Sequence, residues 1–180
     1  VYLIQKNGSS SLRLEHEAHG YSIYRNDQIG NISLIDVYIR NPRIRYVSGV
    51  NTYLQHLQRD YPALDYDTAF WFAKQYKFLN RHYLPQLHWI YNLSRFMSAT
   101  AKIRLRDFKD FGNITSINYA ARVVPPTQDF VSRLLEDNSS MSFWWHVDQV
   151  LLTLAGKEMT WLEIVDHYKK NYPDIAQNVL

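Results

Sequence analysis

Apolar residues recur at three- and four-residue steps in the middle of the chain, which is the pattern of an amphipathic helix. Tyr66-Asp67-Thr68 favours a helix start, because a short oxygen-bearing side chain can accept hydrogen bonds from first-turn amides. We expect this helix to end near residue 82, before Pro85. Its inward face is predicted to hold Ala69, Phe72, Ala73, Tyr76, Leu79 and Tyr83.

A second helix is predicted from Pro85 to about Ser98, because a proline in the first turn loses no helical hydrogen bond. One side of it carries Leu87, Ile90, Tyr91, Ser94 and Met97, and Trp89, Leu93 and Phe96 widen that side. A helix with so much apolar surface should be largely buried.

Residues 102–106 alternate charged and apolar side chains with a period of two, which predicts a half-buried strand. A short helical turn is the alternative. If the segment is a strand, Lys102, Arg104 and Arg106 project from the same solvent-facing side.

The first 47 residues read as a small antiparallel sheet. Residues 1–5 form a candidate strand, Asn7-Gly8 is a favoured hairpin turn, and residues 12–17 alternate as a return strand would. Residues 32–39 are rich in β-branched side chains and suit a central strand. Asn41-Pro42 is interpreted as a turn, and a helix is predicted from Ser48 to Leu57.

The C-terminal part is predicted to be helical. Residues 114–124 fit either strand or helix, and Thr127 caps a helix that carries Phe130 and Leu134. Three further helices are expected over residues 141–155, 160–171 and 174–180, with Gly156 as a C-terminal cap and Thr160 to Glu163 as a capping box. The trio resembles the start of a helix-turn-helix unit, but its last helix lacks the basic side chains that read DNA, which favours a packing or protein-contact role.

These elements predict an α+β fold, in which a small N-terminal antiparallel sheet packs on a mainly helical remainder. Residues 1–110 would form an α+β core with a basic centre and residues 111–180 a helical subdomain, or the whole chain would be one domain. The chain has no cysteine, which fits a reducing compartment. With no apolar run long enough to span a membrane, we expect a cytoplasmic protein.

Charge is distributed unevenly along the chain. The overall net charge is +3, but residues 1–39 carry −1, residues 40–109 carry +8 and residues 110–180 carry −4. A localised positive field of this size attracts polyanions whatever fold lies beneath it.

Basic and aromatic residues also alternate within this centre, where Trp71, Lys74, Phe78 and Arg81 lie along one helix face. Cations neutralise phosphates and exposed rings stack on nucleobases, so the leading hypothesis is a non-catalytic module that binds a polyanion, foremost a nucleic acid. The alternative is an ordinary soluble face on which rings pack under the stems of basic side chains. The candidate binding residues are Arg40, Arg43, Arg45, Trp71, Lys74, Lys77, Arg81, Lys102, Arg104 and Arg106.

The stretch from Ile35 to Leu54 resembles the strand, loop and helix with which GNAT acetyltransferases hold the pyrophosphate of acetyl-CoA. In this resemblance the paired glycines of the family correspond to Gly49 and Asn51. It implies a degenerate acyltransferase with a cofactor loop at residues 45–52, where amides at a helix start would meet the phosphates.

Other catalytic and metal-binding patterns are weak. His16 and His19 would point to opposite faces of a strand, and Asp107 and Asp110 have no partner that assigns acid and base roles. No phosphate-binding or nucleophile motif occurs. We therefore predict no cofactor and no metal, and leave open a third hypothesis, in which aromatic helices bind a protein partner or a second copy of the chain.

Overall fold

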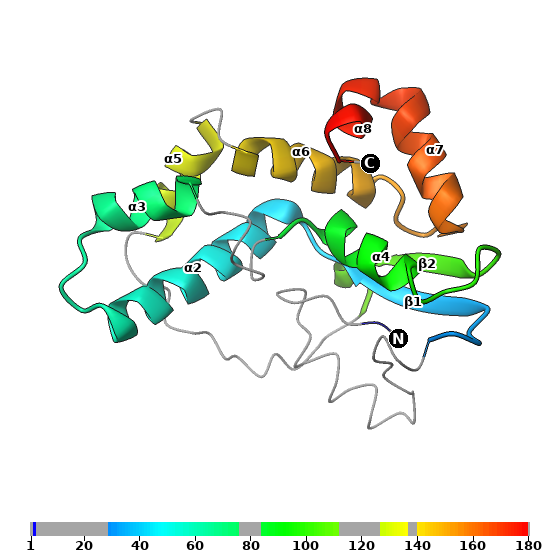
Figure 1. The fold of residues 1–180 in the computed structure, drawn as a ribbon, viewed down its shortest axis with the longest axis horizontal. Coiled ribbons are helices and arrows are strands. Elements are labelled where there is room, and N and C mark those ends of the chain that lie inside the picture. Colours follow the sequence, from blue (N-terminus) through cyan, green and yellow to red (C-terminus); the bar gives the residue numbers. More distant parts are fainter. Residues whose placement is uncertain (1, 3–28, 76–83, 112–126, 137–139, 180) are drawn as a thin grey trace.

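The computed structural model describes Tyr2 and residues 29–75, 84–111, 127–136 and 140–179. Within them the fold is α+β, with seven α-helices and a three-stranded mixed sheet (Figure 1). In chain order the elements are β1 (Leu34–Ile39), α2 (Pro42–Asp60), α3 (Tyr66–Gln75), α4 (Gln86–Ser94), β2 (Lys102–Asp107), the 3₁₀ helix η3 (Phe108–Phe111), α5 (Thr127–Glu136), α6 (Ser140–Leu152), β3 (Glu158–Met159), α7 (Trp161–Asn171) and α8 (Pro173–Val179).

The sheet differs from the antiparallel N-terminal sheet that the sequence predicts. Its order is β1-β2-β3, with β1 parallel to β2 and β2 antiparallel to β3. The parallel arrangement is possible because the helices α2, α3 and α4 lie between β1 and β2 in the chain. The predicted strands at residues 32–39 and 102–106 are confirmed, and the predicted hairpin of residues 1–17 lies outside the described residues except for Tyr2, which bridges to Val37 in parallel.

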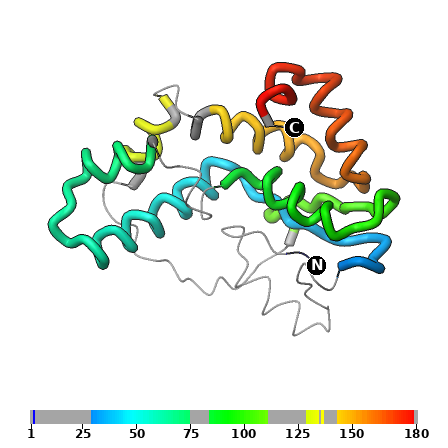
Figure 2. The backbone as a smooth tube through the Cα atoms, in the orientation of Figure 1, coloured from blue at the N-terminus to red at the C-terminus, as the bar shows by residue number. Residues whose placement is uncertain are grey.

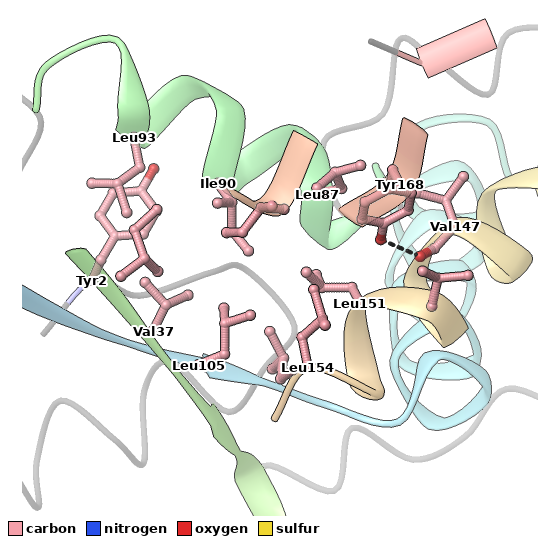
Figure 3. Close-up of a cluster of buried hydrophobic side chains, with 14 of the residues drawn as sticks. Tyr2, Val37, Leu87, Ile90, Leu93, Leu105, Val147, Leu151, Leu154 and Tyr168 are labelled. Atoms are coloured by element: carbon pink, nitrogen blue, oxygen red, sulfur yellow. Dashed lines mark hydrogen bonds between the residues drawn. The ribbon is translucent and has the colours of Figure 1, made fainter. Parts of the chain in front are cut away.

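One face of the sheet is buried under α4 and α6. Along β1 and β2 every second residue is almost inaccessible, including Val37 and Leu105. Figure 3 shows the leucines of α4 and α6 meeting these side chains, with the hydroxyl of Tyr168 donating to the carbonyl of Val147 over 2.8 Å. Each fully buried aliphatic side chain contributes about 1.5–3 kcal/mol, so this layer is the main stabilising core.

A second hydrophobic cluster joins α2, α3 and α5. It consists of Tyr46, Val50, Leu54, Ala69, Ala73, Phe130, Val131 and Leu134. The 19 residues of α2 lead from the end of β1 to the side of the molecule away from the sheet, where α3 follows (Figure 2). Trp144 of α6 packs against both clusters, and β3 pairs with β2, so the described parts of residues 1–110 and 111–180 share core and sheet.

Several helix boundaries differ from the expected ones. Asn41 begins α2 rather than a turn, because its side chain accepts from the amide of Ile44 over 3.4 Å and Pro42 occupies the first helical position. The start of α3 near Tyr66 is confirmed, and Asp65 caps it by accepting from the amide of Thr68. The helix α4 ends at Ser94, four residues earlier than expected.

Parts of the predicted inward helix faces are solvent-exposed. Phe72 of α3 and Tyr91 of α4 are 37% and 45% exposed, whereas Ala69, Ala73 and Ile90 are buried as predicted. The prediction of a buried face was wrong at these two positions, which lie at the margins of their apolar stripes. It was also wrong at Phe96, which is 45% exposed and follows the end of α4. The remaining residues predicted for the first inward face, at positions 76, 79 and 83, lie outside the described residues.

The C-terminal helices are confirmed closely. Thr160 and Glu163 form the predicted capping box, in which the Thr160 amide donates to the Glu163 carboxylate over 2.7 Å and the Glu163 amide donates to the Thr160 hydroxyl over 3.2 Å. The predicted helix end at Gly156 was wrong, because α6 ends at Leu152 and the Gly156 amide donates to the Leu105 carbonyl of β2 over 2.7 Å. Gly156 lies in the turn after α6 and has a φ of +85°. Among the described residues, no helix is both long and apolar enough to cross a membrane.

The left-handed backbone at Gly156 gives a stability prediction. A Cβ at Gly156 would meet no atom within 4 Å, so Gly156→Ala should destabilise only through backbone strain, by about 1 kcal/mol. Gly30→Ala is the matched control, because Gly30 has equally open surroundings without a positive φ. Urea unfolding of both variants measures the difference, and equal free energies of unfolding would contradict the strain argument.

Candidate polyanion interface

The solvent-facing side of β2 carries a row of three cations. Lys102, Arg104 and Arg106 alternate with buried Ile103 and Leu105, as the sequence pattern predicts. In the register of the parallel pair, Arg104 lies beside Asp36 and Arg106 lies beside Tyr38 of β1. The sheet therefore presents a half-exposed face on which cations, the carboxylates of Asp36 and Glu158 and one aromatic ring are neighbours.

Two carboxylates hold the guanidinium groups of this row. Arg104 donates to Glu158 over 2.6 Å and to Asp36 over 3.4 Å, and Arg106 donates to Asp36 over 3.3 Å. The hydrogen bond to Glu158 is the main reason why the pKa of Arg104 is raised above its ordinary value. The pairing fixes the planes of the guanidinium groups but also offsets part of their charge.

Further cations lie near the carboxyl ends of the two parallel strands. The guanidinium of Arg40, which follows β1, lies 5.5 Å from the centre of the Phe108 ring, and burial lowers its pKa. Lys109 pairs with Asp107 over 3.0 Å. Arg43, in the first turn of α2, is exposed and donates to the hydroxyl of Ser132 over 3.5 Å. Each of these cations already contacts a neighbouring side chain, Phe108, Asp107 or Ser132.

The predicted aromatic part of the interface lies elsewhere. Trp71 of α3 is 50% exposed, and its ring meets that of Phe72 edge to face with 5.2 Å between the ring centres. Lys74 is half-buried on the same helix. Because α3 and the sheet lie on opposite sides of the molecule, the structure does not bring Trp71 and Lys74 together with the row on β2 (Figure 1). The candidate residues Lys77 and Arg81 lie outside the described residues.

Arg45 departs from the expected exposed position. It lies in the first turns of α2 and is completely buried, with a guanidinium nitrogen 4.0 Å from the Asp148 carboxylate. Burial lowers the pKa of Arg45, and Asp148 opposes this effect. Its helix turns it toward the interior, so Arg45 does not belong to the exposed basic surface.

The sequence analysis did not predict a buried polar cluster of Arg45, Gln86 and Asp148, called the polar junction below. The amide of Gln86 donates to Asp148 over 2.7 Å, and the Gln86 side chain bonds both the amide and the carbonyl of Arg40, over 2.7 and 2.9 Å. Gln86 and Asp148 are inaccessible to solvent. The available signal was the carboxylate of Asp148, the only acidic residue in the mainly apolar stretch of α6, because a buried carboxylate needs internal partners.

No cofactor loop forms where the GNAT resemblance places one. Residues 45–52 lie within α2, and Gly49 and Asn51 are buried there. Their amides belong to a helix interior, not to an open helix start, so this segment does not supply the expected pyrophosphate site. Among the described residues there is also no group of three or more His, Cys, Asp or Glu side chains that could hold a metal ion.

Comparison of the chain with protein-family models, with curated proteins and with solved structures gives no significant match in any of the three. Functional assignment therefore depends on the geometry and charge of the described residues.

The polar junction should make the stability of the folded protein depend on pH. Burial raises the pKa of Asp148 to about 6, against the opposing effects of Arg45 and the Gln86 amide. Because the folded protein favours the neutral carboxyl group, the contribution of Asp148 to stability is complete below pH about 4 and is lost as the pH rises through about 6. As the pH rises across that interval, the free energy of unfolding of the wild type should fall by up to about 3 kcal/mol more than that of an Asp148→Asn variant. This figure follows from about 1.4 kcal/mol for each unit by which the pKa of Asp148 differs between the folded and unfolded states.

Urea unfolding at several pH values measures this dependence in both proteins. The comparison of slopes, and not of absolute stability, is decisive, because the asparagine also changes hydrogen bonding to Gln86. Parallel curves for the two proteins would show that Asp148 keeps its ordinary titration in the fold.

Proposed function

We propose that the chain is a non-catalytic binding module that contacts a polyanion, foremost a nucleic acid, through the exposed face of β2. The observation that carries the proposal is the row of Lys102, Arg104 and Arg106 on one side of the strand. Alternate residues of a strand are about 7 Å apart, so the row offers evenly spaced cations to an extended chain of phosphates.

The neighbouring strand adds a feature that suits nucleic acid. Tyr38 is half-buried and lies beside Arg106 in the register of β1 and β2. Aromatic side chains on a half-exposed sheet face give unpaired bases a stacking surface, and flanking arginines hold the backbone. This arrangement favours a single strand over a duplex.

The carboxylates of Asp36 and Glu158 compete with an incoming phosphate for the same guanidinium groups. Binding is therefore expected to be weak and sensitive to salt, because each phosphate gained by Arg104 or Arg106 replaces an internal ion pair. The competition also makes the proposal testable in two directions, by removing a cation or by removing a carboxylate.

Charge reversal on the row should weaken binding. We expect Lys102→Glu combined with Arg106→Glu to lower the affinity for a fluorescein-labelled single-stranded oligonucleotide at least about tenfold at low salt, and to flatten its salt dependence. Fluorescence anisotropy measures both quantities. Thermal unfolding confirms that the variant is folded.

Lys169→Glu combined with Lys170→Glu is the matched control, because it makes the same change in net charge at two exposed residues in the last turn of α7, outside the row on β2. It should change the affinity only slightly. Equal losses in the two double variants would show that net charge alone attracts the oligonucleotide, and no binding by the wild type at low salt would refute the proposed function.

Removal of the competing carboxylate should strengthen binding. In Asp36→Asn, Arg106 loses its ion-pair partner and becomes available for phosphate, whereas Arg104 keeps its ion pair with Glu158. We expect the affinity for the same oligonucleotide to rise about three- to tenfold, with a steeper salt dependence. An unchanged affinity in this variant would place the bound phosphates away from Arg106.

A further inference from the structure

A small pocket opens between the end of α4, the start of β2 and the first turn of α7. Its volume is about 240 Å³. The apolar lining consists of Met97, Ala99, Ala101, Ile103, Trp161 and Leu162, and Ser94 and Ser98 add hydroxyl groups. In Figure 1 the first turn of α7 stands over the loop that joins α4 to β2. The pocket is therefore built from segments that lie far apart in the sequence.

Large apolar side chains remain exposed around this pocket. Leu162 is 60% exposed, and Tyr91 and Phe96 are each 45% exposed. The Tyr91 ring lies 5.7 Å from that of Trp161, centre to centre. A cluster of exposed aromatic and aliphatic groups beside a hollow is unusual for a solvated surface and is typical of a protein contact site.

The size of the pocket indicates what it accommodates. Pockets for small organic ligands usually exceed about 300 Å³, whereas this one suits a single large side chain. Interface hot spots have this form, in which one apolar anchor fills a pocket lined by aromatic residues and methionine. A peptide segment of a partner protein fits this description better than a free metabolite does.

The positive and negative side chains around the pocket come from different elements. Arg95 and Lys102 flank the loop between α4 and β2, both are exposed, and neither has an ion-pair contact with another described residue. On α7, Glu163 is occupied by its capping hydrogen bonds, which lower its pKa, and Asp166 lies one turn further along the helix. The loop side of the pocket is therefore the cationic side.

We propose that this pocket binds a peptide segment of a partner protein that inserts a leucine, methionine or phenylalanine between Trp161 and Met97. An acidic residue next to the anchor would lie over Arg95 and Lys102, where its charge is complementary. The apolar anchor site is separate from the polyanion row on the sheet face, and the two proposed sites share only Lys102.

The test is selection of random dodecapeptides displayed on phage against the full chain. Enriched peptides should combine an apolar anchor with a nearby Asp or Glu. Synthetic peptides of these sequences should bind the wild type. Leu162→Glu should lower their affinity at least about tenfold by repelling the acidic residue, and Ala99→Trp should do so by filling the pocket.

Ile44→Glu is the matched control. Ile44 is also an exposed aliphatic residue, 51% accessible, in the first turn of a helix, and a glutamate is favourable at both positions because of the helix dipole. It should leave peptide binding within about twofold of the wild type. Selection of no peptides, or of basic peptides, would overturn the proposal, as would peptides that bind Leu162→Glu and Ala99→Trp as well as the wild type.

Discussion

The start of α4 depends on a carboxylate that lies 62 positions away in the chain. Pro85 precedes this helix and makes no side-chain cap, and no acidic residue occurs in its first turn. Asp148 of α6 supplies the missing acceptor for the Gln86 amide, and Gln86 in turn bonds the backbone at Arg40. One buried acceptor thus joins the end of β1 to two helices, and its loss would leave helix amides unpaired in the interior.

Elements whose signals are local could be predicted from the sequence. The capping box at Thr160 and the alternating strand at residues 102–107 each depend on residues that are close together in the sequence. The parallel pairing of β1 with β2 depends instead on strands 68 positions apart, which periodicity cannot relate. The burial of Arg45 follows from the position of α6 and has no local signal.

The charge of the candidate site could likewise be predicted only in part from the sequence. The positive excess of residues 40–109 predicts a basic surface, and the row on β2 lies within that range. Its counter-charges are Asp36 and Glu158, which come from segments before and after that range and reach the row only through strand pairing. A charge count along the chain therefore overestimates the charge of the folded surface, because neighbours in a sheet are not neighbours in sequence.

The central position of β2 also determines when the sheet can form during synthesis of the chain. Synthesis proceeds from the N-terminus, so β1 is complete long before its partner β2 leaves the ribosome, and β2 in turn precedes β3. Contacts between such distant segments form slowly. The nascent chain therefore holds the apolar side chains of Ile35, Val37 and Ile39 without their partners on β2 until the segment with α2, α3 and α4 has been made.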